Sequence, residues 1–371
     1  MPLLTAEAEK LSQNMLVQGV VENIVVSDQL FALLPFTPIE GKAYVYNREL
    51  TLGSADFVDT DDVINESAAT YTPVTTKLRR IVTDADVDDF LQGTQSDVTD
   101  QTATQIAKKS KKVGLTFADK LVNGNNTTNP KEFDGLIVLC PSAQKIALGA
   151  TAAVALAFDH LDQLIDLVKL GQNRAFVMNS RTIRSYFALC RALGGTDPLH
   201  VAIPGITSPG LPTYRGVPIL KNDYVPIDQT KDGLGRLSTA IPWAAGVVKV
   251  LGDFVKPTVL NPGWVYKCTT AGTTHSVEPT WGSPTEGGTV SEGGGTGVWT
   301  SYRANNTSIL QCSLDEDEGV HGLMASMQAG IEVKEVGAVQ NKDATRWRVR
   351  WYVSLALQSE LAMAMAQGVN N

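Results

Sequence analysis

Residues 41–52, GKAYVYNRELTL, and residues 71–82, YTPVTTKLRRIV, decide the fold of this chain. Both segments are rich in Tyr, Val and Thr, which favour β-strands, so we expect them to pair as a long two-stranded ribbon. Polar side chains lie on both faces of each strand. An isolated ribbon of this kind is marginal in water because it has no apolar face to bury. The sequence therefore predicts that the ribbon docks on another surface.

The ribbon carries opposite charges at its two ends. The segment between the strands is acidic, and the returning strand is basic. The acidic residues are Asp56, Asp59, Asp61, Asp62 and Glu66, and the basic residues are Lys77, Arg79 and Arg80. A single charge of this kind is usually solvated, but the separation of the two signs along one ribbon favours pairing between subunits.

Residues 1–36, before the ribbon, are expected to form an extended or partly helical arm. Their apolar residues have loose helical spacing, and Pro35 and Pro38 end the segment. The segment has too few apolar positions to form a core of its own, so we expect the arm to lie on another surface.

Residues 100–123 are predicted to form a long helix. Apolar side chains recur every three or four residues, as at Val113, Phe117 and Leu121, and Gly124 follows the end. Four lysines fall away from this stripe: Lys108, Lys109, Lys111 and Lys112. A solvated helix flank is the favoured interpretation of these lysines, and a surface facing an enclosed polyanion is the alternative.

The rest of the chain mixes helices and strands. Helices are predicted near 158–170 and 180–193, and strands at 175–178 and near 239–251, 306–314, 331–336 and 346–356. In the last strand Trp347, Val349, Trp351 and Val353 alternate with arginines, which indicates one buried face. The pattern favours an α+β fold over repeated βαβ units.

Residues 256–303 differ in composition, with no helical period and three of the six tryptophans: Trp264, Trp281 and Trp299. Short strands separated by Gly, Thr and Pro predict a small β module inserted at a surface loop. The tryptophans form either a sugar-stacking platform on its surface or, as we favour, its core.

Composition excludes several classes of protein. The chain has 371 residues, 31 basic and 39 acidic side chains and a net charge of −8, which opposes tight non-specific binding of nucleic acid by the whole molecule. No 20-residue apolar run or signal peptide is seen. The four cysteines are widely spaced and expected to be reduced.

Motifs for catalysis, metal binding and cofactor binding are missing from the sequence. There is no GxSxG elbow, P-loop or HExxH motif, and the Gly-rich 293–297 segment is not followed by a Lys-Ser/Thr pair or a helix. The acidic run 315–318 lacks EF-hand spacing and is expected to be a solvated turn. We therefore expect neither an enzyme nor a cofactor or metal site.

The order of elements resembles the HK97-fold major capsid proteins of tailed bacteriophages. The resemblance rests on that order and on short stretches such as 215–223, RGVPILKND, and 342–352, KDATRWRVRWY. It implies an N-terminal arm at 1–36, an E-loop at 37–83, a peripheral domain at 84–170 with a spine helix, and an axial domain at 171–255. The β module at 256–303 interrupts this pattern, and 304–371 complete the axial domain and supply the closing peripheral strand.

The resemblance implies a structural protein of the virion, made in the host cytoplasm, that assembles into an icosahedral shell around double-stranded DNA held without sequence specificity. Hexameric and pentameric capsomers, a portal and a separate scaffolding protein follow from it, and a decoration protein is compatible with it. It implies no contact with a membrane.

Two alternatives remain open. One is an encapsulin-type shell around protein cargo, against which the inserted module and the chain length count. The other is a carbohydrate-binding or tail-associated virion protein that acts through residues 256–303.

Overall fold

The computed structural model describes residues 28–60, 62–63, 66–95, 101–149, 153–171, 173–194, 200–201, 210–231, 233, 235–259, 263–282, 284–327 and 330–370. Residues 1–27 of the expected arm therefore lie outside the described residues. Contacts divide the described chain into two compact units. Unit 1 contains residues 34–138 and 315–359, and unit 2 contains residues 28–33, 139–314 and 360–370.

Unit 1 is built on a mixed sheet with the strand order β1-β19-β21-β20, in which β4 also pairs with β21. Its strands are β1 (Phe36–Ile39), β4 (Arg79–Asp88), β19 (Val320–Ala325), β20 (Glu332–Ala338) and β21 (Ala344–Leu357). Two strands outside this sheet, β2 (Ala43–Thr51) and β3 (Thr70–Lys77), form an antiparallel hairpin. The long β21 organises the unit because β4, β19 and β20 all pair with it.

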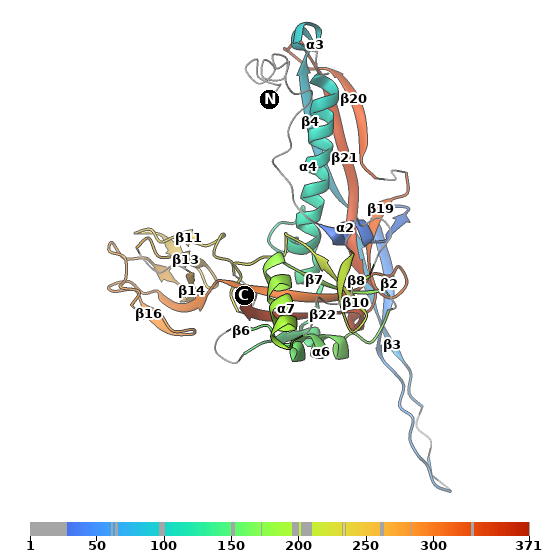
Figure 1. Ribbon diagram of the computed structural model, residues 1–371, viewed down its shortest axis with the longest axis vertical. Coiled ribbons are helices and arrows are strands. Elements are labelled where there is room, and N and C mark those ends of the chain that lie inside the picture. The colour runs from blue at the N-terminus through green and yellow to red at the C-terminus, as the bar shows by residue number, and fades with distance from the viewer. Residues whose placement is uncertain are drawn as a thin grey trace. The chain divides into compact units, whose positions relative to one another are not determined.

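A long helix, α4 (Gln101–Asn123), lies along β4 and β21 and provides the core of unit 1 (Figure 1). Its bounds agree with the predicted helix 100–123. Phe117 is fully buried on its inner face, and its ring centroid lies 4.7 Å from that of Trp351 and 5.9 Å from that of Phe36. The short α3 (Asp89–Gln95) follows β4.

The opposite face of β21 carries a ladder of ion pairs. Arg346 binds Asp86 through two hydrogen bonds of 2.6 and 2.7 Å, and Arg348 binds Asp84 in the same way at 2.8 and 2.9 Å. Side-chain hydrogen bonds from these arginines lower the pKa of both aspartates. The predicted alternation of β21 is confirmed for Val349, Trp351 and Val353, which are buried, whereas Trp347 is half-buried.

Unit 2 is built on a larger mixed sheet with the order β5-β22-β18-β7-β10-β9-β8, in which β6 also pairs with β22. Its strands are β5 (Lys145–Ala147), β6 (Val154–Ala155), β7 (Arg174–Met178), β8 (His200–Val201), β9 (Leu211–Tyr214), β10 (Val217–Lys221), β18 (Asn306–Ser313) and β22 (Met363–Asn370). The core gathers apolar residues of this sheet and of two helices, α6 (Phe158–Leu167) and α7 (Ser180–Ala192).

Short helices complete the two units: α2 (Gln29–Leu33), α5 (Leu136–Leu139), η1 (Ser142–Gln144) and η2 (Glu360–Ala362). The α2 segment is attached to unit 2 through Asp28, whose carboxylate accepts hydrogen bonds from the backbone of Leu30 and Phe31 and from the Asn222 amide. Leu30 is buried, as expected for an arm segment that lies on another surface.

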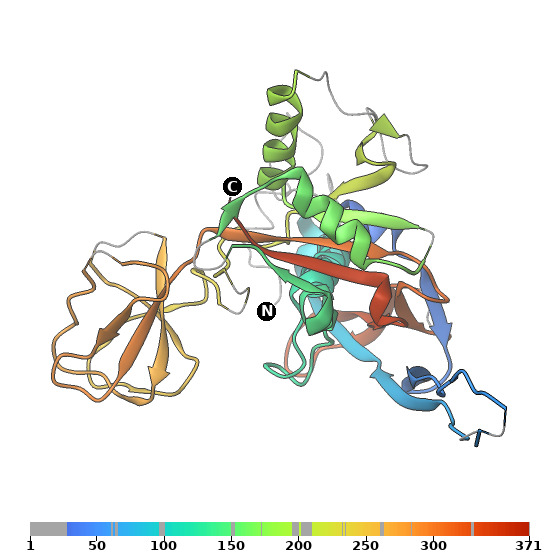
Figure 2. The same cartoon turned by 90° about the horizontal axis from the view of Figure 1, so that it is seen from below.

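A small β module within unit 2 has its own sheet, with the order β11-β13-β14-β17-β16, and a separate β12-β15 pair. The strands are β11 (Ile241–Pro242), β12 (Val248–Lys249), β13 (Phe254–Lys256), β14 (Trp264–Thr270), β15 (Gly272–Thr273), β16 (Thr289–Ser291) and β17 (Val298–Arg303). Figure 2 shows them, yellow to orange, gathered in one group. The sheet begins before residue 256, the expected start of the insertion, because β11 and β13 complete it.

Two predictions about strands differ from the structure. The segment 71–82, expected as one strand, is divided at Leu78 between two strands, because β3 pairs with β2 and β4 pairs with β21. The strand expected near 239–251 is reduced to the short β11 and β12. One βαβ unit is present within the predicted α+β fold, because β7 and β10 are parallel and α7 lies between them in the chain.

The boundary between the units also differs from the expected domain division. It falls between Val138 and Leu139, not after Leu170. The reason is strand pairing, since β5 and β6 lie parallel to β22, which belongs to unit 2.

Candidate subunit interface

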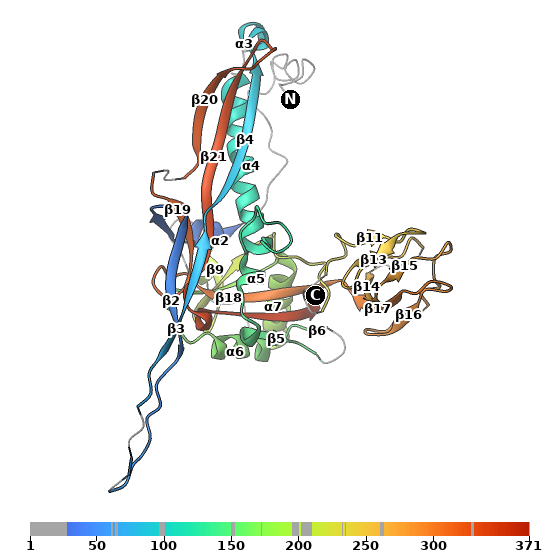
Figure 3. The same ribbon diagram turned by 180° about the vertical axis from the view of Figure 1, so that it is seen from behind.

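The β2–β3 hairpin of unit 1 extends as a narrow two-stranded ribbon (Figure 3). The strands pair in register from Ala43 opposite Lys77 to Thr51 opposite Thr70. All described residues between Glu49 and Ala68 are exposed, so the outer half of the hairpin has nothing beneath it in unit 1. Asp61 of the predicted acidic tip lies outside the described residues.

The hairpin exposes many large apolar side chains. Phe57 is fully exposed, and Val63 and Leu52 are 81% and 74% exposed. The set comprises Val45, Leu50, Leu52, Phe57, Val58, Val63 and Tyr71. Scattered apolar residues are normal on a protein surface, but a concentration on one ribbon marks an interaction site.

The root of the hairpin, the part around Tyr44, Tyr46 and Arg48, is hydrogen-bonded to the end of β21. The Tyr46 hydroxyl donates to the Leu357 carbonyl at 2.5 Å, and the Arg48 guanidinium donates to the carbonyls of Leu357 and Gln358 at 2.5 and 2.8 Å. The Gln358 amide in turn donates to the Tyr44 hydroxyl at 2.8 Å. The hairpin is therefore held at its base and uncovered at its far end.

A histidine lies beneath this root. His321 on β19 is fully buried, and its ring meets that of Tyr44 edge-on, with 5.9 Å between centroids. Burial lowers the pKa of His321 below its usual value of 6.5, while the Gly319 carbonyl and the carboxylates of Asp315 and Asp317 act in the opposite direction. The ring is therefore neutral at pH 7.

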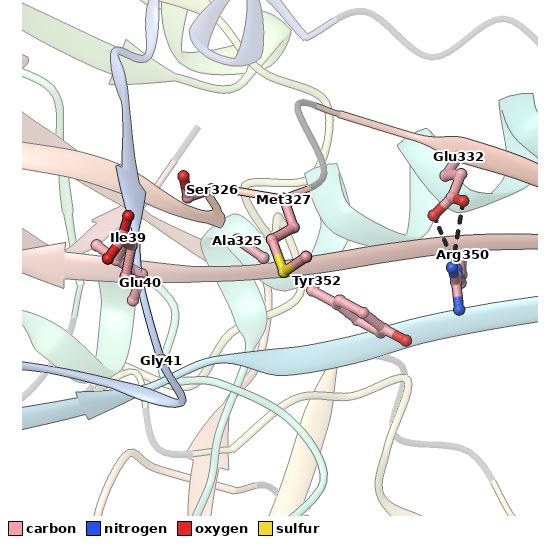
Figure 4. Close-up of a pocket in the computed structure, with 9 residues that line it drawn as sticks. All are labelled: Ile39, Glu40, Gly41, Ala325, Ser326, Met327, Glu332, Arg350 and Tyr352. Atoms are coloured by element: carbon pink, nitrogen blue, oxygen red, sulfur yellow. Dashed lines mark hydrogen bonds and ion pairs between the residues drawn. The ribbon is translucent and has the colours of Figure 1, made fainter.

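A groove of about 670 Å³ opens beside the end of β1 in unit 1 (Figure 4). Ile39, Ala325 and Met327 make its apolar wall, and Met327 is 99% exposed. Arg350 at its edge is engaged by Glu332 through bonds of 2.9 and 3.2 Å. The polar side chains that line the groove are Glu40, Ser326, Glu332, Arg350 and Tyr352.

The four lysines predicted on the long helix lie on the flank of α4 away from Phe117. Lys108 and Lys112 are exposed, and Lys109 and Lys111 are half-buried. This placement fits a solvated flank, and the alternative of a surface toward an enclosed polyanion stays a prediction.

The three predicted tryptophans of the β module do not form a platform. Trp299 and Trp281 are 1% and 6% exposed and pack in the module core, and the half-buried Trp264 lies under the Arg303 guanidinium at 5.3 Å. A sugar cannot stack on a buried ring, so Trp281 and Trp299 agree with the favoured interpretation, the module core, and the alternative of surface aromatics is wrong for these two residues. Trp243, outside the predicted module, belongs to the same core.

A buried carboxylate organises this core. Glu292 is 3% exposed and accepts hydrogen bonds from the indole N–H groups of Trp243 (3.0 Å) and Trp299 and from the His275 backbone (3.0 Å). It is a structural centre that the sequence did not reveal, because its partners lie up to 49 positions away.

Changing this carboxylate is expected to destabilise the module. Glu292→Gln turns one acceptor into a donor that faces an indole N–H, so we expect a loss of about 1–3 kcal/mol in unfolding free energy. Urea unfolding followed by tryptophan fluorescence measures it. Glu316→Gln, at an exposed position, is the control. A midpoint equal to that of the control would contradict this role for Glu292.

Among the described residues no group of three or more His, Cys, Asp or Glu side chains is placed to hold a metal ion. None of their helices is long and apolar enough to cross a bilayer. Asp315 is half-exposed, and Glu316, Asp317 and Glu318 are exposed, in line with a solvated turn.

No protein-family model and no curated protein sequence matches the chain. Solved structures do. The encapsulin of the holo-SrpI complex from Synechococcus elongatus matches with a TM-score of 0.60 and 19% identity, over 100% of this chain and 97% of that chain. The capsid of a native GTA particle matches with a TM-score of 0.57 and 13% identity, over 98% and 97%. A structure from Microbacterium phage Oxtober96 matches with a TM-score of 0.52 and 11% identity, over 99% and 98%. The chain therefore has the HK97-like fold that the sequence resemblance predicts.

Proposed function

We propose that this chain is the subunit of a closed protein shell, and specifically the major capsid protein of a tailed bacteriophage. The observation that carries the proposal is the β2–β3 hairpin, with its root fixed to Leu357 and Gln358 and its apolar end uncovered. A solvated ribbon with Phe57 fully exposed is costly for a monomer and useful to a subunit that meets sister copies. The fold likeness to shell proteins supports the same function.

The proposed mechanism is burial distributed over many equivalent contacts. Each fully buried apolar side chain of the hairpin contributes about 1.5–3 kcal/mol. One such contact is weak, but each subunit of a closed ring gives and receives the same contact, so closure multiplies it. Under this proposal the chain is structural and not enzymatic, and it forms hexameric and pentameric capsomers with a portal and a separate scaffolding protein.

The domain assignment belongs to the same proposal. The hairpin is the E-loop, the α4 and β21 part of unit 1 is the peripheral domain with its spine helix, and the large sheet of unit 2 is the axial domain. The β module is the insertion, and the lysines of α4 form a solvated flank, with a surface toward packaged DNA as the alternative.

An encapsulin-type shell is the second candidate. The match to an encapsulin covers 100% of this chain and 97% of that one. Contrary to the expectation from the sequence, chain length therefore does not separate the two candidates. A carbohydrate-binding module gains no support, since Trp281 and Trp299 are buried.

Electron microscopy of the purified chain tests the proposal. We expect closed particles of uniform size, and particles from infected cells should contain double-stranded DNA. Protein cargo in place of DNA would favour the encapsulin candidate. A chain that stays monomeric at high concentration, with and without its neighbouring gene products, would contradict both.

A further inference from the structure

The β module exposes a short aliphatic segment at residues 246–252, GVVKVLG, which includes the two-residue strand β12 and is called the aliphatic loop below. Val248, Leu251 and Val250 are 70%, 68% and 59% exposed, and Val247 is 38% exposed. Lys249 is the only charged residue of the loop and is 7% exposed. The loop therefore presents adjacent aliphatic side chains to solvent while its one charge is withdrawn from the surface.

The conformation of this aliphatic loop is fixed by hydrogen bonds. The backbone N–H groups of Gly246 and Val247 donate to the Thr274 carbonyl (3.1 Å) and hydroxyl (2.8 Å). At the other end Gly252 N–H donates to the Cys268 carbonyl at 2.9 Å. Gly246 and Gly252 have φ angles of +68° and +94°, which favour glycine, so the turns at both ends are specific. A loop that is already ordered loses little conformational entropy when it binds.

The module does not need the loop for its own core. That core consists of Trp243, Val255, Tyr266, Cys268, Trp281 and Trp299, without the exposed valines or Leu251. Adjacent exposed aliphatic side chains that serve no internal packing mark a contact surface.

The net charge of the β module indicates that the partner of the loop is a second copy of the chain. Residues 241–303 contain four basic side chains, Lys249, Lys256, Lys267 and Arg303, and four acidic ones, Asp253, Glu278, Glu286 and Glu292. The module is thus neutral, although the whole chain carries −8. Two modules can therefore approach without the repulsion that opposes contact elsewhere. An uncharged aliphatic surface is also complementary to itself.

The small surface area of the loop indicates where such a contact forms. Stable association in solution buries about 1,200–2,000 Å² in total, more than a seven-residue loop provides. Subunits held side by side in a shell meet at high effective concentration, so a small contact forms there and adds to the stability of the particle.

We propose that loop 246–252 packs against the same loop of a neighbouring subunit in the assembled particle. This inference rests on the proposed function, since it needs a shell to hold the two copies together. It assigns the inserted module a role in contacts between subunits.

Thiol cross-linking tests the contact. Val250→Cys places a thiol in the loop, and Val277→Cys, 67% exposed on the same module but outside the loop, is the matched control. A short bismaleimide is applied to assembled particles and to unassembled subunits, with the unsubstituted chain in parallel to account for Cys190, which is half-buried. We expect dimers only from the Val250→Cys particles, joined through position 250 of both chains.

A second variant measures the contribution of the contact. Val248→Asp combined with Leu251→Asp places repelling charges in the loop. We expect particles that form but dissociate at lower denaturant concentration than those of Val277→Asp. Particles without cross-links above the control level would overturn the loop contact and leave the proposed function standing. Failure of the unsubstituted chain to form any particle would overturn both.

Discussion

Phe57→Asp is expected to abolish shell assembly while leaving the subunit folded. Phe57 is fully exposed at the end of the β2–β3 hairpin, so its replacement removes no contact within the chain. In an assembled shell the same position would be buried against a neighbour. The variant then loses about 1.5–3 kcal/mol of apolar burial per contact and must also desolvate a carboxylate. Because every subunit repeats the defect, closed particles should fall below detection.

Sedimentation and electron microscopy measure the assembly of this variant, and a urea titration of the unassembled subunit measures its stability. We expect the stability to change by no more than about 0.5 kcal/mol, as for other exposed positions. Val277→Asp, exposed on the β module, is the control for adding one charge to the surface. Shells formed at the unsubstituted yield would show that the hairpin end does not carry assembly.

The long elements of the fold could be predicted because their signals are local. The apolar stripe through Val113, Phe117 and Leu121 defines α4 within one residue, and the alternation of Val349, Trp351 and Val353 defines β21 within one or two residues. The switch at Leu78 was missed for a physical reason. Both halves of residues 71–82 favour a strand, and only the tertiary structure decides that one half pairs with β2 and the other with β21.

The candidate interface was predictable only in part. The ribbon was predicted to dock on another surface because both of its strands carry polar side chains on both faces and cannot form a core of their own. Its anchorage was not found, because the bond from Tyr46 to Leu357 joins residues 311 positions apart, and no local pattern brings them together. The same holds for His321 against Tyr44 and for Glu292 against Trp243. These buried polar contacts decide how the parts are held, and they are long-range by nature.

The burial of His321 predicts that unit 1 loses stability in mild acid. The folded pKa lies below 6.5, so as the pH falls through 6.5 the unfolded chain binds a proton that the folded chain does not. Stability is fully present above this value and falls below it by up to about 1.4 kcal/mol per pH unit, until the folded pKa is reached. Because the ring lies against Tyr44, the loss should loosen the hairpin root first.

Urea unfolding of the unassembled subunit at pH 7.5, 6.5 and 5.5 measures this effect. The His321→Phe variant keeps an aromatic ring against Tyr44 but cannot titrate, so its stability should change far less over this range. His275→Gln, in the β module, controls for removal of a histidine elsewhere. Asp84 and Asp86 do not confuse the result, since their pKa values lie below 3.8 and their ion pairs are lost only at lower pH. An equal loss in the His321→Phe variant and the unsubstituted chain would assign the acid sensitivity to another group.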